Sequence, residues 1–496
     1  MKLRVKELGI STGNVLVVVM NEADTKMLDL HPLDRIKITH GKKMETVVVD
    51  IAKKGSKSIP KGTIGLMDEV IDSTGLKTGN IVSIMPAKKP ISLEYIKKKL
   101  DGYHLSKKEI NQIVWDIVHN KLSEVELTFF VAASYSNENN MDETLWLTEA
   151  MTNEGEQLKL KKKVIIDKHS IGGIPGNRTT MIIVPIMAAA GFTMPKTSSR
   201  AITSPAGTAD TMEVLADVVF PIKRMKDIIK KANACIVWGG ALNLAPADDK
   251  IITVEKSLMV DAESQLLASI MAKKHSVSST HVIIDIPIGP NTKITNREKA
   301  NHLKKDFLNL GKKLGMKITV VLTNGKEPIG KGIGPALEAR DVLKVLRQDE
   351  DRPIDLEKKC IMMAAELFKT VGKKDGLMLA KDILKSGKAY QKMKQIIKLQ
   401  GGNPDVRPEE IPLGRFEYDI ISKRNGRVKS INNLLISKLA RLAGAPQNKG
   451  AGVFLYRHIG DKIIKGKRLL TVYAGSKNKI DYVEQWLEDM DDIICY

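Results

Sequence analysis

Two loops rich in glycine and hydroxyl side chains follow one another within residues 164–214, and they restrict the folds open to this chain. The first, KHSIGGIPGN (168–177), follows a short apolar run typical of a buried strand and precedes a helix predicted from Arg178 to Phe192. The second begins at Ser198 and enters a helix through Asp210. A strand, a glycine loop and a helix N-terminus together present free backbone N–H groups to an oxyanion. Two such loops predict a substrate, or a pair of substrates, with two phosphate groups.

Between Lys161 and about Asp349, runs typical of strands alternate with runs typical of helices. This alternation predicts a largely parallel α/β sheet, and such sheets bind ligands at the carboxyl ends of their strands. The strand candidates are Val164–Ile166, Cys235–Trp238, Val282–Ile286 and Ile318–Leu322.

The first 86 residues contain an internal repeat. LHPLDRIKI (Leu30–Ile38) aligns without gaps with LKTGNIVSI (Leu76–Ile84), and each copy is typical of a turn followed by an alternating strand, after a short helical stretch. The repeat predicts a pseudo-symmetric barrel built from two similar halves. Nothing in it points to catalysis, so we expect a role in assembly or support.

Helices are predicted after the repeat, from Pro90 to about Leu158. Ser106 with Glu109 has the spacing of a capping box at a helix N-terminus, and Ser123 with Glu126 has the same spacing. Towards the end of the chain, Asn425 and Gly426 lie between two β-type runs and predict a tight hairpin.

The expected fold class is therefore α/β and multi-domain. A small β-barrel-like domain is followed by an α-helical domain, a central mixed or parallel α/β domain and a C-terminal α+β domain. The expected segments are 1–86 (assembly), 87–158 (dimerisation and part of the active-site cleft), 159–349 (phosphate and nucleotide binding), 350–400 (helical continuation of the core) and 401–496 (the α+β domain).

The charge balance of the chain favours anionic partners. Lys and Arg number 79 against 58 Asp and Glu, which gives a net charge of +21. A lysine-coated surface, such as that of a heat-adapted protein, accounts for this excess better than a nucleic-acid site does, because aromatic residues make up only 4% and the lysines are spread along the chain. We expect no nucleic-acid partner.

The expected location is cytoplasmic. No apolar run approaches the roughly 18 residues that span a bilayer, and the chain starts without the apolar core of a signal peptide. The three cysteines, Cys235, Cys360 and Cys495, are too scattered for a metal site or a disulfide framework. We expect no membrane partner and no metal.

GKEPIGKG (Gly325–Gly332) almost spells the phosphate-binding loop of nucleoside triphosphatases. It fails because Gly332 stands where a hydroxyl must bind Mg²⁺, and because Pro328 lacks an N–H. We interpret it as a structural turn into the helix predicted at Pro335–Val345.

Three sequence strings together resemble the thymidine phosphorylase family of class II nucleoside phosphorylases. The family signature stands here as Ser198-Ser199-Arg200 and, further on, Gly207-Thr208-Ala209-Asp210-Thr211-Met212-Glu213. KHSIGGIPGN is similar to the family's phosphate loop, and LAPAD (Leu244–Asp248) is another family string. The resemblance covers roughly Pro90 to the C-terminus and implies a helical domain and an α/β domain that close over the site, followed by a C-terminal α+β domain.

Two departures point to one branch of that family. Pyrimidine-specific members carry a base-reading arginine downstream of LAPAD, whereas Ile251–Lys256 contains none, and they lack an extension like residues 1–86. Both features resemble the archaeal AMP phosphorylases, which convert AMP and phosphate to adenine and ribose 1,5-bisphosphate. The resemblance implies AMP and inorganic phosphate as partners, no cofactor, and a homodimer or larger homo-oligomer.

The resemblance also assigns site residues. Asp261 matches the proton donor to the departing base, although Asp261 with Ser264 also has the pattern of an ordinary helix cap. Lys168, Ser170 and Thr208, with Ser198 nearby, match the site of the attacking phosphate, and Arg200 offers a planar fork for phosphate. The role of Lys273 stays open, as does that of His169. The implied substrate-binding residues are Gly173, Ser199, Arg200, Ala201, Ile202, Thr203, Ser204, Thr208, Ser269 and Lys293.

Three other functions compete with this hypothesis. A pyrimidine nucleoside phosphorylase is the nearest enzyme, and a phosphoribosyltransferase of the anthranilate type shares the implied fold but needs Mg²⁺ and pyrophosphate chemistry. A basic nucleic-acid-binding protein belongs to a different class, and a steep salt dependence of nucleic-acid binding would favour it.

Overall fold

The computed structural model describes residues 1–13, 15–201, 204–258, 260, 262–488 and 493–496. The chain divides into two compact units. One comprises Met1–Glu154 with Pro246–Ser269, and the other comprises Gly155–Ala245 with Ile270–Tyr496. Among the described residues, no helix is both long and apolar enough to cross a membrane.

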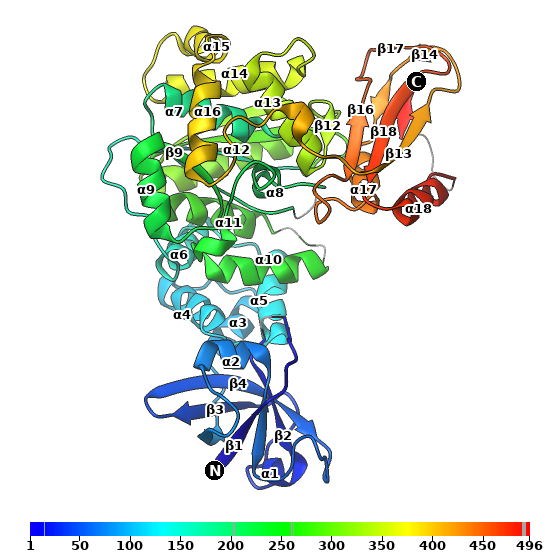
Figure 1. Ribbon diagram of the computed structural model, residues 1–496. Coiled ribbons are helices and arrows are strands. Elements are labelled where there is room, and N and C mark those ends of the chain that lie inside the picture. The colour runs from blue at the N-terminus through cyan, green and yellow to red at the C-terminus, as the bar shows by residue number, and fades with distance from the viewer. Residues whose placement is uncertain (14, 202–203, 259, 261, 489–492) are drawn as a thin grey trace. The chain divides into compact units, whose positions relative to one another are not determined.

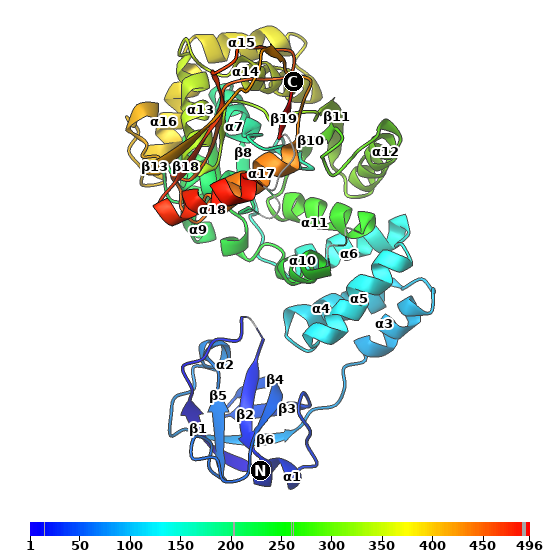
Figure 2. The ribbon, with the colours of Figure 1, turned by 90° about the vertical axis from the view of Figure 1, so that its right-hand side faces the viewer.

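Strands from the first 86 residues close a six-stranded barrel in the order β1-β5-β2-β4-β3-β6 (Figure 2). The predicted repeat maps onto it, because Ile38 of the first copy pairs with Ile84 of the second across β3 and β6, and both side chains are buried. Each half thus has the order strand, strand, helix, strand. The elements are β1 (Lys2–Glu7), β2 (Val17–Asn21), α1 (Glu22–Lys26), β3 (Arg35–His40), β4 (Lys43–Ala52), β5 (Thr63–Leu66), α2 (Asp68–Thr74) and β6 (Ile81–Pro86).

Helices make up the rest of the first unit. The predicted capping boxes at Ser106 and Ser123 are both confirmed, and each serine is the N-cap of its helix. Lys250 ties a later helix to this group, since its ammonium donates to the carbonyl of Ile117 (2.6 Å) at the end of α4. The helices are α3 (Ser92–Leu100), α4 (Lys107–Val118), α5 (Glu124–Ser136), α6 (Met141–Asn153), α10 (Pro246–Leu258) and the first half of α11 (Glu263–Ser276).

The second unit is built on parallel strands, as predicted. One sheet has the order β11-β10-β7, and β8 pairs with β9; a parallel bridge between Ile165 and Thr193 joins the two sets. Three of the four predicted strands are present; the fourth, predicted at Val164–Ile166, is displaced, because β7 begins at Ile166, and β8 is an additional strand. The strands are β7 (Ile166–Ser170), β8 (Met194–Ser198), β9 (Ala234–Trp238), β10 (His281–Ile288) and β11 (Lys317–Asn324).

Helix α7 (Thr179–Ala189) lies at the centre of the second unit's core. Every residue from Thr179 to Ala188 is buried, which explains why its sequence is apolar on all sides. It packs against α14 and α16 (Figure 1), so the glycine loop that precedes it has a rigid support. The other helices are α8 (Thr208–Met212), α9 (Ile222–Ala232), η1 (Gly240–Leu242), α12 (Arg297–Lys313), α13 (Pro335–Arg347), α14 (Ile354–Thr370), α15 (Gly376–Lys385), α16 (Lys388–Leu399) and η2 (Pro408–Glu410).

The C-terminal section carries an antiparallel sheet of order β12-β16-β18-β13 with α17 and α18 (Figure 1). The predicted hairpin at Asn425-Gly426 is wrong: the preceding strand pairs with β18, and the following one pairs with β17. The elements are β12 (Gly332–Ile333), β13 (Phe416–Ile421), β14 (Gly426–Arg427), β15 (Ser430–Ile431), α17 (Asn433–Leu442), β16 (Gly452–Leu455), β17 (Lys462–Ile463), β18 (Arg468–Ala474), α18 (Lys477–Glu488) and β19 (Ile494–Cys495).

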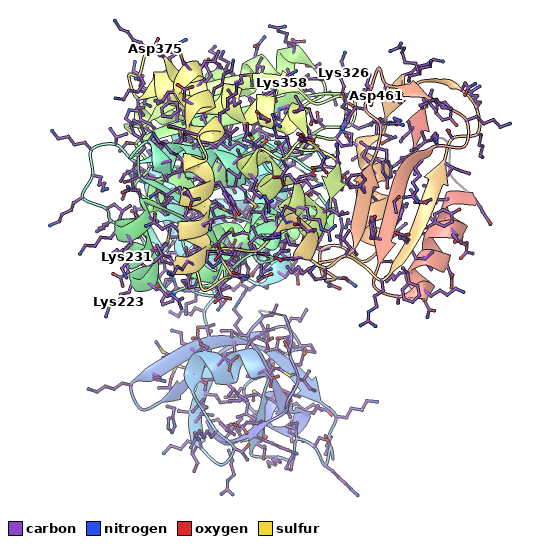
Figure 3. All side chains as sticks on the ribbon, turned by 45° about the horizontal axis from the view of Figure 1, so that its top comes forward. Lys223, Lys231, Lys326, Lys358, Asp375 and Asp461 are labelled. Atoms are coloured by element: carbon purple, nitrogen blue, oxygen red, sulfur yellow. The ribbon has the colours of Figure 1, made fainter. Side chains whose placement is uncertain are left out.

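Exposed lysines occur at separate places on the second unit. Lys223 and Lys231 extend from α9, while Lys326 and Lys358 extend from other segments (Figure 3). On α9 the opposite face is buried through Met225, Ile228 and Ile229. The lysines of α9 therefore lie on the polar face of an amphipathic helix, as expected for a lysine-coated surface.

Replacing Gln400 with Met is expected to lower the free energy of unfolding by about 2 kcal/mol, because it leaves buried backbone groups of β9 without partners. The fully buried Gln400 amide accepts from Ile236 N (2.9 Å) and donates to Ile236 O (2.9 Å) and Asp217 O (2.7 Å). Equilibrium urea unfolding measures the change. The matched control, Gln395→Met on the exposed face of α16, should change stability by less than about 0.5 kcal/mol. Equal values for the two variants would contradict this role of Gln400.

Candidate active site

Lys168, His169 and Ser170 lie on strand β7, not in the loop where the sequence placed them. Successive side chains of a strand point to opposite faces, so Lys168 and Ser170 share one face and His169 lies on the other. Lys168 and Ser170 form hydrogen bonds to Thr179 and Asp285, whereas His169 lies near Lys196 and Lys274. The two expected phosphate ligands therefore lie on one face of β7, and the histidine lies on the other.

The glycine loop packs closely against the segment that follows β10. Gly173 has a φ of +90°, and a Cβ atom there would lie 2.9 Å from the backbone nitrogen of Lys293. Glycine is required on both counts. This close packing brings the backbone of Lys293, another of the expected substrate-binding residues, beside the loop.

A directed chain of hydrogen bonds runs beneath the loop. The buried Lys168 ammonium donates to Thr179 Oγ1 (2.9 Å), which donates to Asn177 Oδ1 (3.2 Å). The amide of Asn177 donates to Ser170 Oγ (3.1 Å), and that hydroxyl donates to Asp285 Oδ2 (3.0 Å). The chain therefore begins at a cation and ends at a carboxylate.

Asp285 is the anchor of this chain at the carboxyl half of β10. The fully buried carboxylate also accepts from Thr323 Oγ1 (2.6 Å) and pairs with Lys359 Nζ (3.0 Å) of α14. Burial alone would raise the pKa of Asp285, but Lys359, Lys168 and the Thr323 hydrogen bond together hold it below the usual value. Asp285 is therefore a charged acceptor.

The second loop is organised by the acidic residues of its own signature. Asp210 Oδ2 accepts from the backbone N–H groups of Ala201 (2.7 Å) and Gly207 (2.8 Å). Glu213 binds both terminal nitrogens of Arg200 (2.6 and 2.8 Å), and Arg200 also stacks on Trp238. The fork of Arg200 that we expected to bind phosphate is thus occupied by Glu213, and the signature acts as a clamp on the loop.

Arg178 joins the two loops. Its guanidinium donates to Thr208 Oγ1 (3.2 Å) and to the carbonyl of Ala206 (2.7 Å), and its Nε pairs with the buried Glu338 of α13. Glu338 in turn accepts from Thr211 Oγ1 (2.9 Å). The Thr208 oxygen accepts from Arg178, and no other described residue accepts the Thr208 hydrogen, so it can donate to a ligand.

Cations are concentrated around both faces of β7. Burial lowers the pKa of Lys168 to about 8, with Lys359 and Arg178 adding repulsion and Asp285 opposing it. On the opposite face, the carboxylate of Asp167 lies between Lys274 (2.6 Å) and Lys196 (3.5 Å), and burial lowers the pKa of Lys196 to about 7. Burial and these lysines hold the pKa of His169 well below its usual value, so its imidazole is neutral. Such a surplus of buried positive charge favours an anionic ligand.

The remaining predicted residues fall into three groups. Asp261, Ile202 and Thr203 lie outside the described residues. Ser198 is the last residue of β8 and Ser204 lies on the second loop, and both donate to the backbone, at Val237 O (3.3 Å) and Ala206 O (2.6 Å). Ser199 is exposed, Ser269 belongs to the first unit on α11, and Lys273 lies on the same helix in the second unit.

The loop that almost spells a phosphate-binding motif is filled by the chain's own carboxylates. The N–H groups of Lys331 and Gly332 both donate to Asp341 (2.7 Å each), and that of Gly330 donates to Asp355 (2.8 Å). The N–H groups that would cradle a phosphate are therefore already bonded, which supports its interpretation as a structural turn into α13.

Four polar residues of the site were missed in the sequence. Asn177 and Arg178 directly follow the last glycine of the first loop, so their position was a usable signal. Asp285 lies inside an apolar strand, where a carboxylate needs a buried partner. Lys359 comes from a helix more than 180 residues after the loop, and no local pattern connects the two.

Two glycosyl transferase domain families match the chain. Residues 93–155 match the helical bundle domain of the glycosyl transferase family, and residues 162–390 match its a/b domain. The multi-domain α/β expectation is confirmed at this level.

Curated relatives extend the likeness over almost the whole chain. It is 46% identical to the AMP phosphorylase of Pyrococcus furiosus over 484 residues, which is 97% of this chain and 95% of that one. It is 44% identical to the AMP phosphorylase of Thermofilum pendens, covering 100% of this chain and 95% of the relative.

The fold is similar to that of a solved anthranilate phosphoribosyltransferase from Thermus thermophilus. The TM-score is 0.53 at 19% identity, over 62% of this chain and 98% of that chain. An anthranilate phosphoribosyltransferase from Saccharomyces cerevisiae gives 0.51 at 16% identity, over 63% and 98%. Identities this low show a shared fold alone.

Proposed function

Because the chain belongs to the family of AMP phosphorylases, we propose that it cleaves AMP with inorganic phosphate. It is a pentosyltransferase of the glycosyl transferase family. The bond between C1′ of the ribose and N9 of adenine breaks, a phosphate oxygen bonds to C1′, and the base leaves with a proton. The products are adenine and ribose 1,5-bisphosphate. The 5′-phosphate stays on the sugar, so both the substrate and the product carry anions that the protein must bind.

The buried cationic network around the first glycine loop carries this proposal. Phosphorolysis needs no nucleophile from the protein, since phosphate itself attacks the sugar, and catalysis depends on positioning and on charge stabilisation. Lys168 supplies a buried positive charge and Thr208 a free hydroxyl hydrogen, and Arg178 holds their two loops together. We assign the attacking phosphate to Lys168, Ser170 and Thr208, with Ser198 beside them.

We assign the nucleotide to the second loop and its neighbours. The residues are Gly173, Ser199, Arg200, Ala201, Ile202, Thr203, Ser204, Ser269 and Lys293. In this assignment Arg200 shapes the loop through Glu213, and Lys293 binds the 5′-phosphate from beside the glycine loop. A phosphate loop and a nucleotide loop joined by one arginine would hold the two reactants next to each other.

Replacing Asp261 with Asn is expected to lower kcat for AMP by about 10²- to 10⁴-fold while KM for AMP changes little. Asp261 is the proposed proton donor to N7 of adenine, and an amide can donate a hydrogen bond there but cannot transfer the proton. Adenine release followed by chromatography measures both constants. The exposed Asp227→Asn serves as the control and should behave as the unmodified protein. Unchanged turnover of Asp261→Asn would remove this residue from the mechanism.

The decisive test of the function is a panel of nucleosides and nucleoside 5′-monophosphates, incubated with and without phosphate. We expect phosphate-dependent release of adenine from AMP. Release of base from thymidine or uridine but not from AMP would favour a pyrimidine nucleoside phosphorylase, which the relatives do not favour. Steeply salt-dependent retention of RNA or DNA without any base release would favour a nucleic-acid-binding protein.

We also propose that the enzyme is cytoplasmic, works without a cofactor and forms at least a homodimer through its helical domain. Phosphate is the co-substrate, so the balanced reaction requires no redox or group-carrying cofactor. Val125 and Phe129 are one turn apart on α5 and share a face, and they are exposed by 60% and 52%; exposed apolar side chains on one helix face are typical of a surface that another chain covers. Light scattering of the purified protein tests the dimer.

A further inference from the structure

The hydroxyl of Ser170 has a fixed hydrogen-bonding direction. A serine hydroxyl donates one hydrogen bond and accepts two. Its hydrogen goes to Asp285 (3.0 Å), and one of its acceptor positions is taken by the Asn177 amide (3.1 Å). No other donor among the residues that the structure describes reaches this oxygen, so one acceptor position is left for a ligand.

This direction cannot reverse while Asp285 is ionised. Lys359 forms an ion pair with Asp285 and Thr323 donates to it, so the carboxylate stays charged and can only accept. If Ser170 turned its hydrogen towards a ligand, two acceptor oxygens would face each other at 3.0 Å without a proton between them. Asp285 thus acts as a positioning residue through Ser170.

An acceptor in an anion site discriminates between oxyanions by their protons. Inorganic phosphate carries at least one P–OH group near neutral pH and can donate to Ser170, whereas sulfate carries none. A fully unprotonated anion would bring an oxygen lone pair against that of Ser170, and a site whose hydrogen bonds are left unmade rejects the wrong ligand. Lys168 and Thr208, in contrast, donate to either anion equally well.

We propose that Asp285 makes Ser170 a hydrogen-bond acceptor that selects protonated phosphate over sulfate at this site. The inference rests on the proposed function, because it takes the site around Ser170 to be that of the attacking phosphate. It adds that the P–OH group of the bound phosphate faces Ser170, so an unprotonated oxygen is left to attack C1′.

The test compares phosphate with sulfate as ligands of the full-length protein in the absence of AMP. Binding is measured at neutral pH as the rise in melting temperature with anion concentration. The unmodified protein should bind phosphate at least about tenfold more tightly than sulfate. Ser170→Ala should lower phosphate affinity to near that of sulfate while sulfate affinity is kept, and retained sulfate binding also shows that the site is folded.

Thr208→Val is the matched control, since it removes a donor from the neighbouring loop. It should weaken phosphate and sulfate by similar factors and leave their ratio unchanged. Asp285→Ala frees the hydrogen of Ser170 without removing its oxygen, and it should lower the phosphate-to-sulfate ratio as Ser170→Ala does.

Equal loss of both anions in Ser170→Ala would show that Ser170 is a donor and would overturn the inference. An unmodified protein that binds the two anions equally would also overturn it, even if it releases adenine from AMP. Selective phosphate binding without adenine release would leave the inference standing and would contradict the proposed reaction alone.

Discussion

Replacing Lys168 with Met is expected to lower kcat/KM for phosphate by about 10²- to 10³-fold. The side chain is 1% exposed and its ammonium donates to Thr179 at the start of α7, directly behind the glycine loop. Met has a similar volume but no charge, so the packing is kept while the cation that attracts phosphate is lost. Initial rates at varied phosphate and saturating AMP measure the change.

The pH dependence of kcat/KM for phosphate in the unmodified enzyme should reflect the titration of Lys168. The pKa of Lys168 is about 8, so its ammonium is charged below that pH and becomes neutral above it. Phosphate binding needs the charged form, and kcat/KM for phosphate should therefore fall about tenfold per pH unit above pH 8. In Lys168→Met this fall of kcat/KM at high pH should disappear, because the titrating group is gone.

Lys358→Met provides the matched control. Lys358 lies exposed on α14 (Figure 3), so removing its charge changes the surface but not the buried network. It should keep the rate and the pH profile of the unmodified enzyme. A Lys168→Met variant with the same kcat/KM as this control would show that phosphate binds elsewhere.

The sequence predicts those parts of the fold where local pattern and burial agree. The helix after the first glycine loop is apolar on every side and is buried on every side, so its existence and start were readable. The barrel repeat was readable because equivalent residues, such as Ile38 and Ile84, meet in one strand pair.

Strand β8 could not be predicted because its residues are not those expected of a buried parallel strand. MPKTS contains a proline and a lysine, neither of which is typical of a buried parallel strand. Lys196 is nevertheless buried there because Asp167 on the neighbouring strand β7 lies 3.5 Å away. A partner on another strand decided the structure, and such a partner cannot be read from a five-residue window.

In the active site, too, some features follow from the local sequence and others depend on tertiary contacts. The two loops were predicted from glycine and hydroxyl residues, which are adjacent in sequence. Arg200 was assigned to phosphate from its chemistry, but Glu213 lies close enough to occupy both of its terminal nitrogens. Residues such as Asp285 and Lys359 meet only after the sheet and α14 have packed together. Sequence therefore predicts which groups can bind an anion, and tertiary contacts decide which of them are left to do so.

Replacing Glu338 with Ala is expected to lower the free energy of unfolding by about 3–5 kcal/mol, since it leaves a buried arginine without its counter-charge. Arg178 and Glu338 are exposed by 8% and 0% in their side chains. The same carboxylate accepts from Thr211 Oγ1 (2.9 Å) and from the backbone nitrogen of Gly334 (3.2 Å), so three donors lose their acceptor together. Equilibrium urea unfolding measures the loss, with the exposed Glu350→Ala as control.

The same replacement should also raise KM for phosphate more than KM for AMP, which separates a role in the site from a role in the fold alone. Arg178 holds Thr208 and Ala206 of the second loop, and without Glu338 its guanidinium is no longer fixed in that direction. Glu338→Gln keeps an acceptor oxygen for Arg178 and should recover part of both losses. If Glu338→Ala unfolds at the same urea concentration as Glu350→Ala, the buried pair does not stabilise this unit, and Arg178 cannot be what holds the two anion loops together.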